Sequence, residues 1–321
     1  MRVVTASRRT DLPAFYSEWF SARLRAGWAV ATNPFNGKPY TVSLRREDVS
    51  AFVFFSRNYA PFRPALDELE RRGYPFYLHL TITGLPPELQ PRVIAAAEAA
   101  AQLRGLAARL GPERVQWRFD PVLLTDELGP DFCLARFRWL ARALEGATAR
   151  CYFSFTQMYR KVQRNLLRAG VTPLPGNVGE RRALAQELAD VARQHGMGIY
   201  ACCQPELVGG LVLPGRCVDP EVLREIGAPL SARPSFGVAR RGCGCLQGPD
   251  LGAYDTCPHG CVYCYANQDP ALARRRLSTH APDQPALLPS PTAGAPHLPA
   301  RPGEAAPYQP APTGRTKKVT G

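Results

Sequence analysis

Three cysteines near the end of the chain have a spacing that suits metal chemistry. Cys257, Cys261 and Cys264 form a C-x3-C-x2-C loop that also contains Pro258 and Gly260. Such a short loop can wrap three thiolates, the usual protein ligands of iron–sulfur clusters, around one cubane. Glycine permits the tight backbone path between the ligands, and proline stiffens it. The spacing therefore predicts a [4Fe-4S] cluster with three irons held by the protein and one iron left open.

Two other ligand sets remain open for this loop. Three cysteines and His259 would complete a tetrahedral zinc site, but His259 lies between two ligands, too close for easy convergence, so iron–sulfur is favoured. Alternatively, Cys243 or Cys245 just upstream closes the fourth iron. That would make the chain a non-radical electron-transfer or redox-sensing protein. Both are therefore included among the candidate metal ligands.

The remaining cysteines of this region are Cys202, Cys203 and Cys217. Ten cysteines in a chain expected to be cytoplasmic point to metal or redox chemistry rather than to disulfides. Some of them, together with Cys243 and Cys245, fit a second metal site. Alternatively, Cys202 and Cys203, at a predicted strand end, face the barrel mouth as redox or substrate-contacting thiols, and Cys203 and Cys217 fit burial in the core.

The loop, with Tyr263 immediately before its last cysteine, resembles the cluster motif of radical S-adenosylmethionine enzymes. The resemblance implies that the open iron binds the amino and carboxylate groups of S-adenosylmethionine, and that reductive cleavage gives a 5′-deoxyadenosyl radical. It also implies an electron donor such as a ferredoxin or flavodoxin. Tyr263 is a candidate cofactor-binding residue. The Gly-Gly-Glu stretch that holds the cofactor's amino group in those enzymes is not seen after the second predicted strand; Glu206, with Gly209 and Gly210 after the sixth, is a second candidate for this purpose.

The elements that must position these residues alternate between strands and helices. Six apolar runs predict strands at Arg2–Ser7, Ala51–Ser56, Phe76–Ile82, Val115–Phe119, Cys151–Thr156 and Gly198–Cys203. Helical patterns lie between them at Ala14–Ala26, Pro64–Arg72, Glu88–Leu110, Phe132–Leu144, Tyr159–Ala169 and Gly179–His195. This alternation implies a parallel sheet. We expect a TIM-like βα barrel, complete or partial, of about six units, with a doubly wound open sheet as the alternative.

Charged side chains follow the predicted strands. Arg8, Arg9 and Asp11 come after the first strand, and Arg118 and Asp120 end the fourth. In a βα barrel all such ends open onto one face, where active sites form. Guanidinium groups match carboxylates and phosphates. We therefore expect the arginines to bind a small anionic molecule or the cofactor carboxylate, and the aspartates to orient them or to bind ribose hydroxyls.

Longer stretches of the chain resemble one family, the bacterial and archaeal domain of unknown function numbered 1848. The stretches that carry the resemblance are residues 7–16, 33–36, 117–121, 243–245 and 250–267. It covers residues 2–267 and implies a C-terminal cysteine cluster like the one that opens radical S-adenosylmethionine domains, but no reaction. Members often have an aromatic-Thr-Lys-Asn-Pro segment after the second strand; here Arg57 replaces the lysine.

Composition and charge limit which classes of protein this chain can belong to. The chain has 321 residues, 45% of them hydrophobic, and a formal net charge of +13. It has no apolar run long enough to span a membrane and no signal peptide, so we expect a cytoplasmic protein without a membrane partner. The charge leaves nucleic-acid binding or action as a further alternative. Motifs of serine hydrolases, phosphate loops and zinc proteases are absent from the sequence.

The chain is expected to have three parts. We expect a barrel over 1–230, a cysteine-rich segment over 231–267 packed on the barrel mouth, and a disordered Pro/Ala-rich basic tail over 268–321.

Overall fold

The fold is built on one parallel β-sheet, seen in a computed structural model that describes residues 1–232, 234–237 and 242–288. Within these residues the sheet has seven strands, hydrogen-bonded in chain order without a reversal: β1 (Arg2–Ala6), β4 (Val49–Ser56), β5 (Phe76–Thr81), β6 (Val115–Val122), β7 (Arg150–Phe155), β8 (Gly198–Cys202) and β9 (Val212–Gly215). All six predicted strands form, and the predicted α/β class with a parallel sheet is confirmed. A closed barrel is not shown, because β1 and β9 are the two ends of this sheet.

The strands bury both faces, which is why they read as continuous apolar runs. In β4, Phe52 and Phe54 point to one hydrophobic cluster, while Ala51, Val53 and Phe55 point to another. The first cluster is the larger and lies between the sheet and the helices. The second lies against the opposite face, where it meets the segments that follow β9.

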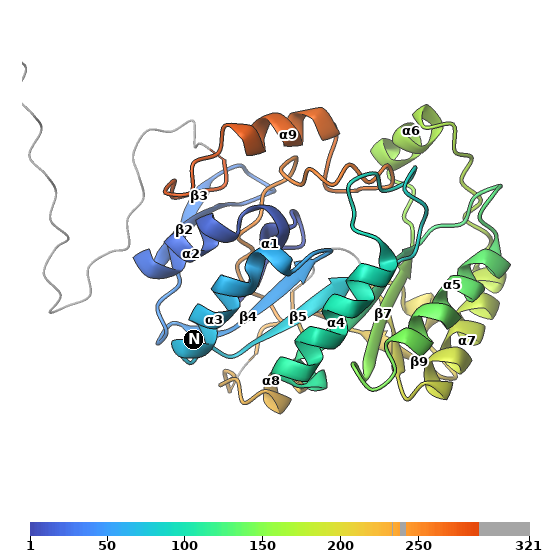
Figure 1. Ribbon diagram of the computed structural model, residues 1–321, viewed down its shortest axis with the longest axis horizontal. Helices are drawn as coiled ribbons and strands as arrows, with labels where there is room; N and C mark the ends of the chain where they lie inside the picture. Colours follow the sequence, from blue (N-terminus) through green and yellow to red (C-terminus); the bar gives the residue numbers. More distant parts are fainter. Residues whose placement is uncertain (233, 238–241, 289–321) are drawn as a thin grey trace, which may run out of the picture.

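Nine α-helices occur in the described residues: α1 (Leu12–Phe15), α2 (Ser17–Ala26), α3 (Arg63–Arg71), α4 (Ala96–Leu110), α5 (Pro130–Ala143), α6 (Arg160–Arg168), α7 (Val178–Gln194), α8 (Pro220–Glu225) and α9 (Pro270–Ser278). Figure 1 shows α3, α4, α5 and α7 along one side of the sheet. The predicted helix from Ala14 is divided at Tyr16. The one from Glu88 begins only at Ala96, because a proline at position 91 would break its interior.

Several elements of the structure were not predicted from the sequence. An antiparallel hairpin, β2 (Trp28–Thr32) and β3 (Pro39–Ser43), lies outside the main sheet. Three short 3₁₀ turns, η1 (Ala60–Phe62), η2 (Pro112–Arg114) and η3 (Pro205–Leu207), and the strand β9 were also missed. Helix α8 buries Val222 and Leu223 in the second hydrophobic cluster.

The segment before the cysteine loop lies beside β1, on the side away from β4. Thr5 donates its backbone N–H to the Pro249 carbonyl (2.9 Å) and accepts from Leu251 N–H (2.9 Å), in a parallel bridge with Asp250. A Cβ on Gly248 would lie 1.9 Å from the Val3 carbonyl oxygen. Only glycine therefore allows this close approach.

The expected disorder from residue 268 onward is wrong for residues 268–288. Helix α9 begins after Asp269, which caps it by accepting from Ala271 N–H. Beyond the helix, the Gln284 carbonyl accepts from the Trp19 indole (2.8 Å), and Leu287 is buried. The proline-rich composition begins only near residue 281, so it does not prevent this packing. The rest of the predicted tail, 289–321, lies outside the described residues.

In the described part of the chain, none of the helices combines the length and the apolar character needed to span a bilayer.

Candidate functional site

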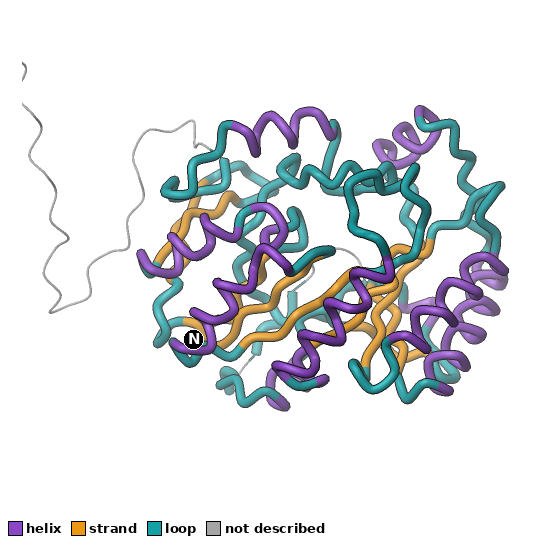
Figure 2. Tube along the Cα trace, in the orientation of Figure 1, coloured by secondary structure: helices purple, strands orange, loops and turns teal. Residues whose placement is uncertain are grey.

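The cysteine loop lies over the carboxyl ends of the first strands of the sheet. Figure 2 shows a long loop run, joined to α9, across that end of the molecule. Its anchor is His259, which is buried. His259 Nε2 lies 2.7 Å from Asp11 Oδ2, and Nδ1 lies 3.0 Å from the Arg92 carbonyl oxygen. Both ring nitrogens are therefore engaged, and neither is available to a metal ion.

Asp11, predicted to orient an arginine or to bind a ribose hydroxyl, connects three parts of the chain. Its Oδ1 accepts from Ser56 Oγ (2.6 Å) and from Ala14 N–H (3.1 Å). Its Oδ2 accepts from the backbone N–H of Arg57 (2.8 Å) as well as contacting His259. This carboxylate thus ties β1, the end of β4 and the cysteine loop together. All of these contacts hold protein segments together. Asp11 does not pair with Arg8 or Arg9, because both arginines pair with a different carboxylate.

Tyr263 is held by a second set of contacts. Its hydroxyl donates to Gln90 Oε1 (2.9 Å) and accepts from Arg57 Nη2 (3.1 Å). Arg57 Nη1 also donates to Gln90 Oε1 (3.2 Å). Tyr263 is only 5% exposed. In this arrangement it positions the loop through Arg57 and Gln90.

The three thiols of the loop lie within electrostatic reach of one another. Burial, then Asp11, Cys264 and Cys261, raise the pKa of Cys257 well above its usual value. Burial and Cys261 raise the pKa of Cys264 to about 11. Arg57 lies beside them: burial alone would lower its pKa, but Tyr263, Cys261 and Cys257 outweigh burial and raise it. A fixed cation therefore stands next to the three sulfurs.

These contacts bear on which metal group the loop could hold. Across residues 1–232, 234–237 and 242–288, no group of three or more His, Cys, Asp or Glu side chains already has the arrangement of a metal site. The engagement of His259 leaves three thiolates as the donor set of the loop. Three thiolates beside an arginine suit a cluster with one open iron, and they do not complete a four-ligand structural zinc site.

Arg8 and Arg9 share one carboxylate, that of Asp250. Their Nε atoms lie 3.5 Å from Asp250 Oδ2 and 3.4 Å from Asp250 Oδ1, respectively. Asp250 also accepts from Ser7 Oγ (2.6 Å) and from Gly252 N–H (2.9 Å). Burial would raise its pKa, but Arg9, Arg8 and Ser7 outweigh burial and lower it. Two cations share one anion, so the group formed by Arg8, Arg9 and Asp250 carries one net positive charge.

Arg118 and Asp120, both predicted site residues, pair with each other. Arg118 Nη2 donates to Asp120 Oδ2, and Ser154 Oγ donates to Asp120 Oδ1 (2.6 Å). Arg118 Nη1 lies 2.8 Å from the Cys217 sulfur. The Arg118 side chain is therefore directed to cysteines, and its charge is shared between a carboxylate and a thiol.

Cys243 and Cys245, predicted as ligands with the loop, lie with another group of cysteines. Cys245 Sγ accepts from the Cys217 backbone N–H (3.1 Å), and its thiol is hydrogen-bonded to the side chains of Cys217 and Cys243. Cys217 Sγ lies 3.1 Å from Cys202 Sγ, which lies 3.8 Å from Cys203 Sγ. Hydrogen bonds from Cys202 and Cys245, and then Arg118, lower the pKa of Cys217 well below its usual value.

Glu206 lies in η3, which packs along α7. Its backbone carbonyl accepts from Arg182 Nε.

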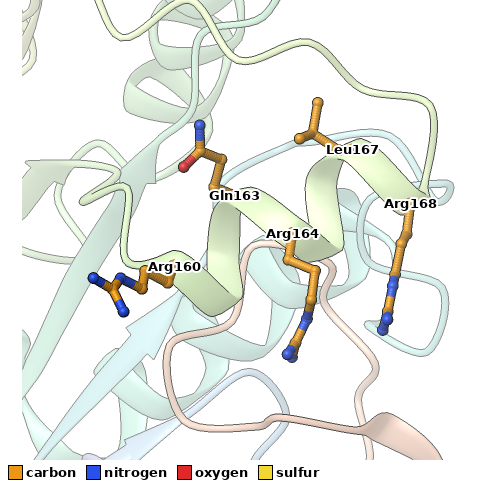
Figure 3. Close-up of a pocket in the computed structure, with 5 residues that line it drawn as sticks. All are labelled: Arg160, Gln163, Arg164, Leu167 and Arg168. Carbon is orange, nitrogen blue, oxygen red and sulfur yellow. The ribbon is translucent and has the colours of Figure 1, made fainter.

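Helix α6 covers the cysteine loop. Val162 and Leu166 on its inner side are buried in one cluster with Cys261 and Tyr263. The outer side presents exposed arginines at one-turn spacing, beside a surface hollow of about 540 Å³. The hollow is lined by Arg160, Gln163, Arg164, Leu167 and Arg168 (Figure 3). Arg164 Nη2 also lies 3.4 Å from the Gln268 carbonyl oxygen, just beyond the loop.

A family model, that of the domain of unknown function DUF1848, matches residues 3–266. The chain belongs to this family. The match covers nearly all of the sheet and the cysteine loop, and it confirms the resemblance to this family. Comparisons with curated proteins and with solved structures found no match.

Sequence reasoning did not assign three residues of this site. Asp250 stands in a stretch that carried the family resemblance, but its spacing from Arg8 gives no sign of their pairing. Gln90 lies in an irregular segment that was predicted to be helical. Arg57 was noted only as a replacement for lysine. Only Arg57, directly after β4, carried a usable signal, that of a charged residue at a strand end.

Proposed function

We propose that this protein is an iron–sulfur enzyme similar to radical S-adenosylmethionine enzymes, with a [4Fe-4S] cluster on Cys257, Cys261 and Cys264. The observation that carries the proposal is the engagement of both His259 ring nitrogens, by Asp11 and by the Arg92 carbonyl. It leaves a three-thiolate donor set at the strand ends. Such a cluster, when bound, would supply an open iron for the cofactor and an electron for its cleavage.

The position of Cys243 and Cys245 favours this function over a four-thiolate electron-transfer centre. Cys245 contacts Cys217 and Cys243, and so belongs to a separate group of sulfurs. A cluster that lacks a fourth protein ligand, and so has one open iron, can bind a cofactor, whereas a cluster with four protein ligands is closed.

The chain's own residues would then bind an anionic group. Arg8 is the more accessible of the two arginines at Asp250, with 25% of its side chain exposed against 9% for Arg9. The net positive charge at this strand end is therefore presented mainly by Arg8. Guanidinium groups match carboxylates and phosphates, which makes Arg8 the expected contact for a carboxylate of the substrate or cofactor.

The proposal includes closure of the sheet as a TIM-like barrel. The segment 246–251 would fill the space between the two end strands. Support comes from both sides: Leu246 N–H donates to the Val218 carbonyl (3.0 Å) after β9, and Leu251 N–H donates to Thr5 in β1 (2.9 Å). Closure would bring the cysteine loop and all strand ends to one mouth.

The test is reconstitution of the full chain under anaerobic conditions. We expect about four irons and four sulfides per chain at this site, an EPR signal of the reduced cluster that changes on addition of S-adenosylmethionine, and formation of 5′-deoxyadenosine. The Cys261→Ser variant should lose all three. The Cys133→Ser variant, which changes a buried cysteine of α5, is the matched control. A cluster whose signal does not respond to S-adenosylmethionine would refute the enzyme proposal.

The electron donor would dock on the outer side of α6. Flavodoxins and ferredoxins present acidic surfaces, and opposite charges accelerate association. We expect Arg164→Glu with Arg168→Glu to slow cluster reduction by reduced flavodoxin about tenfold at low ionic strength. The control is Arg138→Glu with Arg142→Glu, an equally spaced exposed pair on α5. Equal rates in the two double variants would contradict this docking site, and a loss of DNA retention confined to the α6 variant would assign the surface to nucleic acid instead.

A further inference from the structure

A second group of five cysteines belongs to the second hydrophobic cluster, on the face of the sheet opposite the helices. Cys202 ends β8, Cys203 follows it, Cys217 comes after β9, and Cys243 and Cys245 precede the segment beside β1. Their sulfurs form a continuous run of contacts. Cys203 lies 3.8 Å from Cys202, and Cys202 lies 3.1 Å from Cys217. Cys217 is hydrogen-bonded to Cys245, and Cys245 is hydrogen-bonded to Cys243.

From this grouping we propose a second metal centre, in which Cys202, Cys217 and Cys245, with Cys203 or Cys243 as the fourth ligand, bind one zinc-like metal ion in a tetrahedron of thiolates. Four sulfurs bonded to one zinc ion at about 2.3 Å lie about 3.8 Å from one another. The contact of 3.8 Å between Cys202 and Cys203 equals this spacing, and the contact of 3.1 Å between Cys202 and Cys217 is shorter, so these two sulfurs would move slightly apart around the ion. Both contacts are too short for the wider arrangement of sulfurs around a cubane. These contacts form a chain of sulfurs and do not yet surround one point. The sulfur of the fourth ligand, Cys203 or Cys243, therefore moves toward the other three when the metal binds.

The surroundings compensate the charge that such a site carries. Four thiolates and a divalent ion have a net charge of −2, which is costly to bury without cations. Arg118 Nη1 lies 2.8 Å from the Cys217 sulfur. Arg8 lies near enough to Cys245 and Cys217 to interact with both electrostatically. Two guanidinium groups, each also paired with a carboxylate, therefore offset part of the charge of a buried thiolate site.

The backbone at Cys217 is held as metal ligands usually are, by neighbours outside the site. Tyr77 donates its hydroxyl to the Cys217 carbonyl (2.7 Å), and His79 Nε2 lies 2.8 Å from the same oxygen. Cys202, Cys203, Cys217 and Cys245 are each less than 10% exposed. Burial of this kind keeps protein redox partners away, which favours a metal over a disulfide used in exchange.

The experiment isolates this site from the loop. The starting protein is the full chain with Cys257→Ser, Cys261→Ser and Cys264→Ser, purified anaerobically. Cobalt(II) is the probe, because tetrahedral thiolate binding gives strong thiolate-to-cobalt charge transfer and intense visible bands. We expect about one cobalt per chain with these bands, and X-ray absorption with only sulfur neighbours at about 2.3 Å. Zinc, iron and sulfide contents of the protein as purified identify the native metal.

Further variants decide the assignment. Adding Cys202→Ser and Cys217→Ser to the loop variant should abolish the cobalt bands. Adding Cys133→Ser and Cys151→Ser, two buried cysteines elsewhere in the core, should leave them unchanged. A folded loop variant that binds no cobalt, or a Cys202–Cys217 disulfide found by mass spectrometry in the anaerobic protein, would overturn the proposal. The X-ray absorption arm needs only the loop variant, so a failure of the Cys202 and Cys217 variant to fold leaves the test intact.

This inference does not rest on the proposed function. The loop variant removes the proposed [4Fe-4S] ligands, so metal that it retains reports on the second site alone. Conversely, if the loop variant loses its iron and also binds no cobalt, the result would support the proposed enzyme and would overturn the second metal centre.

Discussion

The Asp250 carboxylate offers the sharpest test of how the strand ends are held together. The change is Asp250→Asn, which keeps the shape of the side chain and removes its charge. Asn can still accept from Ser7 and from Gly252 N–H, but Arg8 and Arg9 lose their shared counter-ion. The Asp250 side chain is only 12% exposed, so water replaces little of the lost interaction.

The magnitude follows from this burial. Removing one partner of a buried ion pair costs about 3–5 kcal/mol, because the other charge stays buried without compensation. Here Arg8 is partly exposed and recovers some hydration, so we expect the lower end, about 3 kcal/mol. The same interaction lowers the pKa of Asp250 in the folded protein. Its stabilisation is therefore complete above the unfolded pKa of about 3.9, and is lost as pH falls through the lower folded value.

The assay is urea unfolding followed by far-ultraviolet circular dichroism at pH 7 and in steps down to pH 3. The variant should unfold at lower urea than the wild type between pH 5 and pH 7, and the difference should shrink below about pH 4. Glu187→Gln, an exposed carboxylate on α7, is the matched control and should shift stability by less than about 0.5 kcal/mol. A difference below 0.5 kcal/mol at pH 7, or one that persists unchanged at pH 3, would refute the reasoning.

Two further predictions concern the attachment of the C-terminal segment. Gly248→Ala should lower the free energy of unfolding by about 1–3 kcal/mol, since its Cβ would lie 1.9 Å from the Val3 carbonyl. Gly105→Ala, exposed in α4 with no atom near its Cβ, should instead stabilise by about 0.5–1 kcal/mol in the same urea assay; a loss at both positions would contradict the steric argument. His259→Ala should reduce the iron retained after anaerobic reconstitution and desalting, because the loop loses its bond to Asp11. His195→Ala, at the end of α7, should retain wild-type iron, and equal retention by both variants would count against an anchoring role for His259.

Local patterns were enough to predict most of the scaffold. Strands such as β4 and β5 are apolar on both faces, and this pattern survives in any parallel sheet that is covered on both sides. Helix α7 begins at a capping box, in which Asn177 and Glu180 each accept from the other's backbone N–H. The hairpin strand β3 was not predicted because its residues are mostly only partly buried and mix polar with apolar types. Strand β9 was not predicted because it has only four residues and two of them are a proline and a glycine, which strands disfavour.

The sequence by itself determined the parallel α/β class, the cysteine spacing of the loop and the charged residues at the strand ends. These follow from interactions between residues a few positions apart, which a periodicity or a motif records. Only the tertiary structure decided which groups meet. Asp11 pairs with His259, 248 positions away in the chain, Asp250 pairs with Arg8 and Arg9, and Cys245 contacts Cys217. Such partners are chosen by the way the backbone folds back on β1 and β9, and the alternation of residue types along the chain holds no record of that path.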